Sequence, residues 1–226
     1  DEGRGVRKNS AQAARWYRKA AEQGHAQSQF RLGVMTQNGR GVPQDSIAAL
    51  GWQRQAGEQG HLPAQLSLAL IYGGGKGIPR NATRQAHWTQ QAADQGHVTS
   101  QAGLARMYAQ GRGVAQDPAE AARWYRKAAD QDDPESQFHL GDSYDKGLGI
   151  GQDPSEAAKW YRLAAGQDHG HAQQNLGHLY MTGKGVSQDY AQAAHWYEKS
   201  AEKGFADAQN GLATLYQNGW GVAADL

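Results

Sequence analysis

The segment His171–Gly204, HAQQNLGHLYMTGKGVSQDYAQAAHWYEKSAEKG, contains one copy of the motif from which the chain is built. Its tryptophan belongs to a series in which every interval is 36 residues. The members of this series are Trp16, Trp52, Trp88, Trp124, Trp160 and Trp196. A leucine follows each of them by 16 residues, and a glutamine precedes each leucine by three. Sequence repeats with a period of about 20 to 50 residues are typical of solenoids.

The first half of each period is predicted to be a helix that carries the repeated tryptophan. An Asp or Asn, whose side chain can accept from free backbone N–H groups, stands seven residues before each tryptophan. These predicted N-caps are Asn9, Asp45, Asn81, Asp117, Asp153 and Asp189. In the quoted segment, Ala193, Trp196 and Tyr197 follow at steps of three and four, which places them on one helix face. Gly204 then ends the helix.

The second half is predicted to be a helix that carries the repeated leucine, roughly from His171 to Met181 in the quoted segment. Its buried stripe includes Ala172, Leu176 and Tyr180. A loop of the form Gly-x-Gly-Val then leads to the next N-cap. We call the two elements the Trp helix and the Leu helix. Because the tryptophans recur at helical spacing once per period, we expect them to pack in the core and to take no part in binding.

These combined motifs resemble the Sel-one-like repeat (SLR) family, a relative of the tetratricopeptide repeat, over essentially the whole chain. The resemblance implies an all-α fold, a right-handed superhelical α/α solenoid of antiparallel helix pairs with a 36-residue repeat. We expect a single solenoid over 1–226 that begins with a lone helix (9–23) and ends with another (205–218). Five full repeats are expected between them, at about 25–60, 61–96, 97–132, 133–168 and 169–204. Flanking helices are expected beyond both ends, since the chain starts inside a repeat and stops at the next cap, Asp225.

The composition argues against several classes of function. The net charge is +1, with 23 basic and 22 acidic residues intermixed, so no basic stripe predicts nucleic-acid binding. There is no cysteine, which excludes disulfides and thiolate chemistry. No apolar run approaches the roughly 18 residues of a membrane span. The composition suits a bacterial protein, and its compartment stays open, with the periplasm or cell envelope favoured over the cytoplasm.

An enzyme or a metal protein is the competing class. His139, Asp142, His171 and His178 lie on neighbouring Leu helices, but a metal needs converging ligands with a supporting shell, and a polar groove explains the same residues. No Gly-x-Ser-x-Gly or His-Glu-x-x-His motif is present. Penicillin binding and hydrolysis in cysteine-rich relatives carries over only weakly, because their disulfides cannot form here. We therefore expect no catalytic residue, metal or cofactor.

Binding is expected on the concave face of the solenoid, which the resemblance to tetratricopeptide repeats assigns to the Leu helices. The predicted partner-binding residues are Phe30, Arg31, Asn38, Arg106, Gln110, Phe138, His139, Asp142, Lys146, Asn175, His178, Asn210, Asn218 and Trp220. Exposed positions of the same kind hold Val34, Gln174, Thr182 and Thr214. Phe30 and Phe138 are either anchors for a partner or packing residues between helices. Trp220 is either a contact residue or, as we favour, a lid on the last helix.

The family resemblance implies a protein-binding scaffold or adaptor as the leading function. The partner would present an extended peptide or a protein protrusion, and a toxin or effector is one such partner. The alternative is an immunity protein that neutralises a secreted lipase or phospholipase toxin of a type VI system. A metal-binding or hydrolytic enzyme is the third hypothesis.

Overall fold

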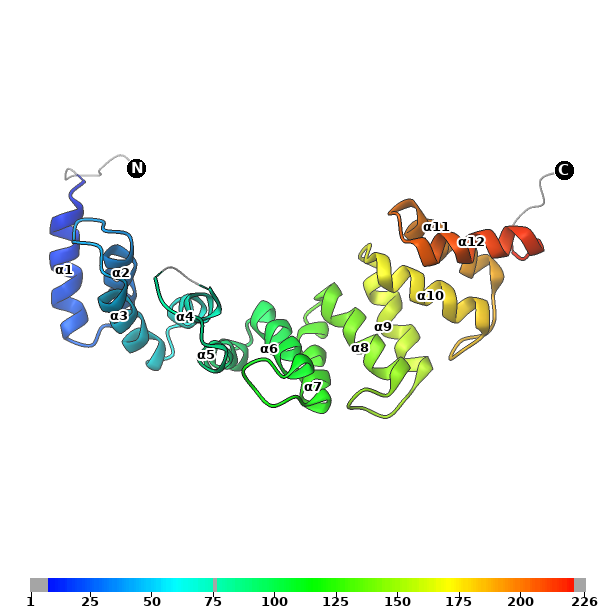
Figure 1. Cartoon of the computed structure of the whole chain (residues 1–226), viewed down its shortest axis with the longest axis horizontal. Helices are drawn as coiled ribbons and strands as arrows, with labels where there is room; N and C mark the ends of the chain where they lie inside the picture. Colours follow the sequence, from blue (N-terminus) through cyan, green and yellow to red (C-terminus); the bar gives the residue numbers. More distant parts are fainter. Residues whose placement is uncertain (1–7, 75–76, 222–226) are drawn as a thin grey trace. The chain divides into compact units, whose positions relative to one another are not determined.

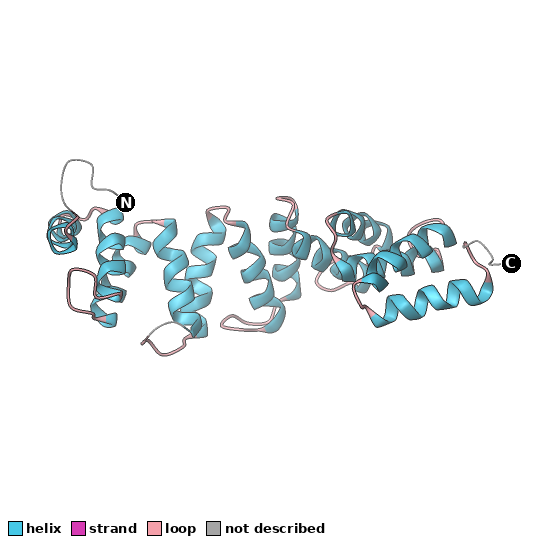
Figure 2. Cartoon of the chain, turned by 90° about the horizontal axis from the view of Figure 1, so that it is seen from above, coloured by secondary structure: helices cyan, strands magenta, loops and turns pink. Residues whose placement is uncertain are grey.

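The computed structural model describes residues 8–74 and 77–221; the predicted cap Asp225 lies outside them. Within these residues the chain forms twelve α-helices joined by loops and contains no strand (Figure 2). The all-helical solenoid expected from the 36-residue period is thereby confirmed. The single domain, the repeat bounds and the superhelical handedness stay predictions.

Trp helices and Leu helices alternate along the chain. The Trp helices are α1 (Ser10–Glu22), α3 (Ser46–Glu58), α5 (Ala82–Asp94), α7 (Pro118–Ala129), α9 (Pro154–Gly166) and α11 (Tyr190–Glu202). The Leu helices are α2 (Ala26–Gln37), α4 (Leu62–Gly74), α6 (Val98–Gln110), α8 (Pro134–Lys146), α10 (Gly170–Thr182) and α12 (Ala206–Asn218).

The helices fall into two compact units, one of residues 1–107 with 111–115 and one of residues 108–110 with 116–226. In the first unit, α2 packs against α1 and α3, and α4 packs against α3 and α5 (Figure 1). In the second unit, α8 packs against α7 and α9, while α10 packs against α9 and α11. Each of these four Leu helices therefore packs between its own Trp helix and the next one.

The predicted N-caps of all six Trp helices are confirmed. Each Asp or Asn has an extended backbone, and its side chain accepts from an N–H two or three residues on. The cap also closes the preceding loop, because the N–H of Asp153 donates to the carbonyl of Tyr144, 2.9 Å away, and that of Asp189 donates to Tyr180. One residue thus fixes both the end of a loop and the start of a helix.

The Leu helices begin with a different cap, which composition alone does not suggest. His25, His61, His97 and His169 each accept a backbone N–H three residues on through Nδ1, at 3.2–3.3 Å. Asp133 takes the same role in the fourth period. These histidines are therefore structural caps in their neutral form, since only an unprotonated Nδ1 can accept.

Glycines recur in the loops after the Leu helices and in the turns after the Trp helices, and the backbone geometry there explains them. Gly149 has a φ of +71°, and a Cβ there would lie 2.1 Å from the carbonyl carbon of Pro118, so the loop after α8 packs directly on the start of α7. After the Trp helices the chain also enters the left-handed region, usually at glycine. Asp132 and Asp168 adopt that conformation, with φ of 63° and 69°, which aspartate tolerates better than most residues.

A buried glutamine amide links successive helices. The Nε2 of each repeated glutamine donates to a carbonyl at the end of its own Trp helix, at 3.1–3.3 Å. These residues are Gln29, Gln65, Gln101, Gln137, Gln173 and Gln209. In four of these glutamines, Oε1 also accepts from the side chain of the C-cap residue of the next Trp helix. These C-cap donors are Gln59, Gln95, Gln167 and Lys203. Each of these carbonyls also accepts the backbone N–H of the residue three positions on, so the glutamine supplies its second hydrogen bond.

The tryptophans vary in burial more than the period suggests. Trp88 and Trp124 are buried, as expected, and Trp52, Trp160 and Trp196 are partly buried. The expectation of core packing is wrong for Trp16, whose side chain is 64% exposed. No described helix precedes α1, so only Lys19 lies over this ring.

Substituting the buried glutamine tests the contribution of these hydrogen bonds to stability. Gln137→Met keeps the side-chain size but removes one of the two hydrogen bonds to the Ala129 carbonyl and the acceptor of the Gln167 amide, so we expect a loss of about 1–2 kcal/mol in the free energy of unfolding. Gln209→Met removes the equivalent bond at an exposed position, and water can replace it there, for an expected loss under about 0.5 kcal/mol. Urea denaturation measures both values; equal losses would contradict the role of burial.

Acid should weaken the cap at His61. Burial, and to a lesser degree the charge of Arg31, lowers the pKa of His61 in the folded protein. The stability that this cap contributes is therefore complete above the unfolded pKa of about 6.5 and is lost as the pH falls from there through the lower folded pKa. His61→Asp, which copies the native Asp133 cap, should reduce the stability lost between about pH 7.5 and 5.5 by roughly 0.5–1 kcal/mol. Denaturation midpoints at both pH values measure the difference. His87→Asn, on an exposed residue that caps no helix, should leave the loss unchanged.

Candidate partner-binding surface

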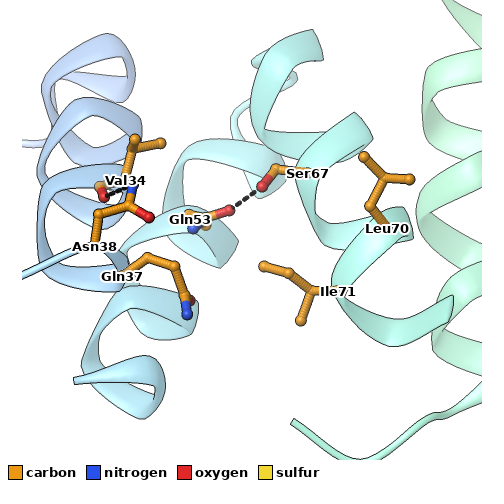
Figure 3. Close-up of a pocket in the computed structure, with 7 residues that line it drawn as sticks. All are labelled: Val34, Gln37, Asn38, Gln53, Ser67, Leu70 and Ile71. Atoms are coloured by element: carbon orange, nitrogen blue, oxygen red, sulfur yellow. Dashed lines mark hydrogen bonds between the residues drawn. The ribbon is translucent and has the colours of Figure 1, made fainter. Parts of the chain in front are cut away.

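The first unit has a groove between the Leu helices α2 and α4, with a volume of about 340 Å³ (Figure 3). Its lining consists of Val34, Gln37, Asn38, Gln53, Ser67, Leu70 and Ile71. Aliphatic side chains come from both Leu helices, and the Trp helix α3 supplies the residue between them. We call this site the apolar groove.

The floor of the apolar groove is Gln53, which directly follows the repeated Trp52. At this position four other periods have a tyrosine (Tyr17, Tyr125, Tyr161 and Tyr197). Gln53 is only 1% exposed, and its Oε1 accepts from the hydroxyl of Ser67. Because Oε1 of Gln53 is bonded within the protein and Val34, Leu70 and Ile71 supply aliphatic groups, the surface left for a ligand is mainly apolar.

Leu70 is the residue that sequence reasoning missed. It lies two residues after the repeated Leu68, where other periods have Val34, Arg106, Asp142, His178 and Thr214. Its side chain is 75% exposed, although it is a large aliphatic residue on a well-formed helix. The sequence feature that could have indicated this site is a large apolar residue at a position that varies from period to period.

The second unit has a hollow of about 370 Å³ in the same register, four periods further on. Its lining consists of Gln174, Asn175, His178, Met181, Tyr197, Asp207, Asn210, Gly211 and Thr214. We call this site the polar groove. Three predicted binding residues (Asn175, His178 and Asn210) come together there, whereas Asn38 lines the apolar groove.

The two predicted aromatic anchors are partly buried. Phe30 lies against the ring of His61, with centroids 5.1 Å apart. Phe138 stacks on the cap His169 at 4.7 Å and contacts the ring of Tyr161 at 6.0 Å. Both phenylalanines therefore support the start of the next Leu helix, and a partner contact through either one stays a prediction.

His139, Asp142 and Asn175 surround the buried tyrosines of the second unit. His139 stacks on Tyr125 at 4.7 Å, and its Nε2 lies 3.2 Å from Oε1 of Glu135. The hydroxyl of Tyr161 donates to Asp142 at 2.9 Å. Burial, followed by the negative charge of Asp142, raises the pKa of Tyr161, and Asn175 hydrogen bonds to the same hydroxyl. A partner that binds His139, Asp142 or Asn175 would therefore have to contact the parts of these side chains that do not already pack against the tyrosines.

Glu135 joins the two histidines that flank Phe138. Its Oε2 lies 3.1 Å from Nε2 of His169 and its Oε1 contacts His139. Burial alone would raise the pKa of Glu135, but the hydrogen bond from His169 and the charges of both histidines together lower it. The carboxylate is therefore committed to structural contacts.

The remaining predicted residues lie at the surface. Arg31, Arg106, Gln110 and Lys146 are exposed, and Lys146 pairs with Asp142 at 2.5 Å. Asn218 ends α12 and donates to the carbonyl of Thr214. Trp220 is 40% exposed and stacks on Tyr190 at the start of α11, with centroids 4.9 Å apart. That contact is compatible with a lid on the last helix pair.

No group of three His, Cys, Asp or Glu residues in the described part of the chain is arranged to hold a metal ion. In the suspected cluster, His139 and Asp142 have the contacts above, and His171 packs edge-on to Phe205 at 4.5 Å. Across residues 8–74 and 77–221, none of the helices has the length and apolar character to cross a membrane.

Comparison with known proteins reports the same repeat. The sequence model of the Sel1 repeat matches residues 1–25, 26–61, 62–97, 98–133, 134–169, 170–205 and 206–226. None of the curated proteins matches the chain.

Two solved structures are similar in sequence as well as in fold. One is a protective antigen present in uropathogenic Escherichia coli strains that displays an SLR fold. It is 37% identical, with a TM-score of 0.75, over 94% of this chain and 45% of that chain. The other is a Sel1 repeat protein from Oxalobacter formigenes, 35% identical, with a TM-score of 0.66, over 97% of this chain and 64% of that one.

This chain thus spans less than two thirds of either relative. An immunity protein from Pseudomonas aeruginosa is 17% identical with a TM-score of 0.44, over 92% of this chain and 78% of that chain, which carries no argument about function. The repeat matches along the whole sequence and the two similar structures lead to one conclusion: the chain belongs to the Sel1 repeat family.

Proposed function

We propose that this chain is a non-catalytic scaffold that binds a partner protein through its Leu helices, and that the apolar groove receives an apolar side chain of that partner. The Sel1 repeat is a protein-interaction scaffold fold. The observation that carries the proposal is Leu70, which is mostly exposed at the edge of a groove that Val34 and Ile71 also line.

A partner that covers the apolar groove gains binding free energy from the apolar surface it removes from water. Exposed apolar side chains gathered around a hollow mark interaction sites, because covering them removes apolar surface from water. Covering one leucine side chain contributes about 1.5–3 kcal/mol, so a single anchor can dominate the affinity for a short segment. The side-chain oxygen of Gln53 on the floor does not compete for a ligand, since it already accepts from the hydroxyl of Ser67.

The size of the groove limits the form of the partner. A volume of about 340 Å³ lies at the lower end for ligand sites and suits one or two side chains. The surrounding Leu-helix surface is polar and exposed at Arg31 and Asn38. An extended peptide or a protein protrusion with one apolar residue flanked by polar residues fits this arrangement.

Leu70→Ser is the direct test of the proposal. We expect peptides selected from a displayed random library on the native chain to carry an apolar residue, and their affinity to fall about tenfold for Leu70→Ser, as the loss of about 1.4 kcal/mol predicts. Fluorescence anisotropy with the labelled peptide measures the affinity. Stability should change little, because the side chain is exposed.

The chain offers a matched control in Ile47, a 77% exposed aliphatic residue on the Trp helix α3 that does not line the groove. Ile47→Ser should leave peptide affinity unchanged. If the two variants bind equally well, or if Ile47→Ser causes the larger loss, the partner does not use the apolar groove.

A further inference from the structure

The polar groove differs from the apolar groove at nearly every equivalent position. Four periods separate the two sites, so their residues can be compared one to one. Leu70 and Val34 of the apolar groove correspond to Thr214 and His178 of the polar groove. Asn210 and Asp207 of the polar groove correspond to Leu66 and Pro63, which lie outside the lining of the apolar groove. The same backbone scaffold therefore presents aliphatic groups in the first unit and hydrogen-bonding groups in the second.

The polar groove also carries a charge that the apolar groove lacks. The residues that line the apolar groove are all uncharged, whereas the lining of the polar groove includes the carboxylate of Asp207. Asp207 Oδ2 accepts from Nε2 of Gln174 at 3.3 Å. Among the residues that the structure describes, no Lys, Arg or His side chain forms an ion pair with Asp207. Its negative charge is therefore available to a ligand.

The floor of the polar groove adds an oxygen that can accept a hydrogen bond. Burial, followed by the charge of Asp207, raises the pKa of Tyr197 to about 12, so the hydroxyl stays neutral. That hydroxyl donates to Sδ of Met181 at 3.9 Å, which is a weak acceptor. Gly177 and Gly211 leave room for the ring, since a Cβ at either residue would lie within 3 Å of it. The phenol oxygen and the amide oxygens of Asn175 and Asn210 thus line the same hollow as the carboxylate.

We propose that the polar groove binds a cationic side chain, that of an arginine or lysine, from a partner protein. A carboxylate together with several uncharged oxygen acceptors suits a group that carries only donors, and a guanidinium can donate to several acceptors at once. The inference rests on the proposed function for the statement that the ligand belongs to a protein. The charge of the ligand follows from the polar groove alone.

An anionic ligand is the alternative that the site must exclude. The start of α12 carries a positive partial charge, and its N-cap Phe205 provides no side-chain hydrogen bond. However, Asp207 already places a carboxylate in that first turn and would repel an anion.

The test uses small probes on the isotope-labelled intact chain. N-acetyl-arginine methylamide should shift the backbone amide signals of Asn175, His178 and Thr214, with saturation in the millimolar range. The citrulline analogue has nearly the same shape without the charge, and we expect it to bind at least fivefold more weakly. The aspartate analogue should cause no shift at these residues. Equal binding of arginine and citrulline, or preferential binding of aspartate, would overturn the proposal.

Two variants tie the result to the polar groove. Asp207→Asn is close to isosteric and should remove the difference between arginine and citrulline, whereas Glu198→Gln, on an exposed residue of α11 outside the groove, should preserve it. Thr214→Leu, which introduces the side chain of Leu70, should weaken arginine binding at least fivefold. If Asp207→Asn bound arginine as the native chain does, the assigned charge would be wrong.

The outcome can be separated from that of the proposed function. Leu70→Ser alters the apolar groove only, so it should leave the arginine titration unchanged. Failure of the peptide experiment with a normal arginine titration would refute the apolar groove alone. The reverse result would refute the cationic site and leave the apolar groove in place.

Discussion

The bonds of the buried glutamine amides are the constraint on which the rest of the structure depends. An amide has a donor end and an acceptor end, and both must be satisfied when it is buried. In Gln137 one end is bonded to the last turn of α7 and the other to the cap of α9, so a single side chain sets the spacing of three successive helices. The first of these bonds recurs in all six periods, always between a glutamine and the carbonyl eight residues before it.

This constraint leaves freedom at particular places. Each repeat in a solenoid contacts only its neighbours, so an exposed residue of a Leu helix can change without disturbing distant repeats. The floor position after the tryptophan has a more restricted kind of freedom. Tyr161 fills the space beside Gly141, where a Cβ would lie 2.7 Å from the ring, and Gln53 has the same relation to Gly33. Exchange of tyrosine for glutamine there alters the groove above while the helix contacts persist.

Much of the fold could be predicted because each element has a local cause. The caps Asp153 and Asp189 act through bonds to residues two or three positions away, so their sequence position suffices to assign them. The burial of Trp16 could not be predicted from the period, because it depends on whether another helix covers it. The apolar groove was missed for a related reason. The floor of the groove is Gln53 of α3 and its edge is Leu70 of α4. These two residues occupy different positions of the repeat, so the repeat pattern does not indicate that they meet.

The periodic sequence also explains how one chain can hold sites of different chemistry. Leu70 and Thr214 stand in the same register of the repeat, and each lines a groove whose floor is the residue after the tryptophan, Gln53 in one and Tyr197 in the other. Stability does not require a leucine at an exposed position, and an exposed leucine lowers solubility. The same reasoning applies to Asp207, whose charge gains no ion pair within the described residues. Side chains that the fold does not need, at positions where a ligand can reach them, are where binding is best sought.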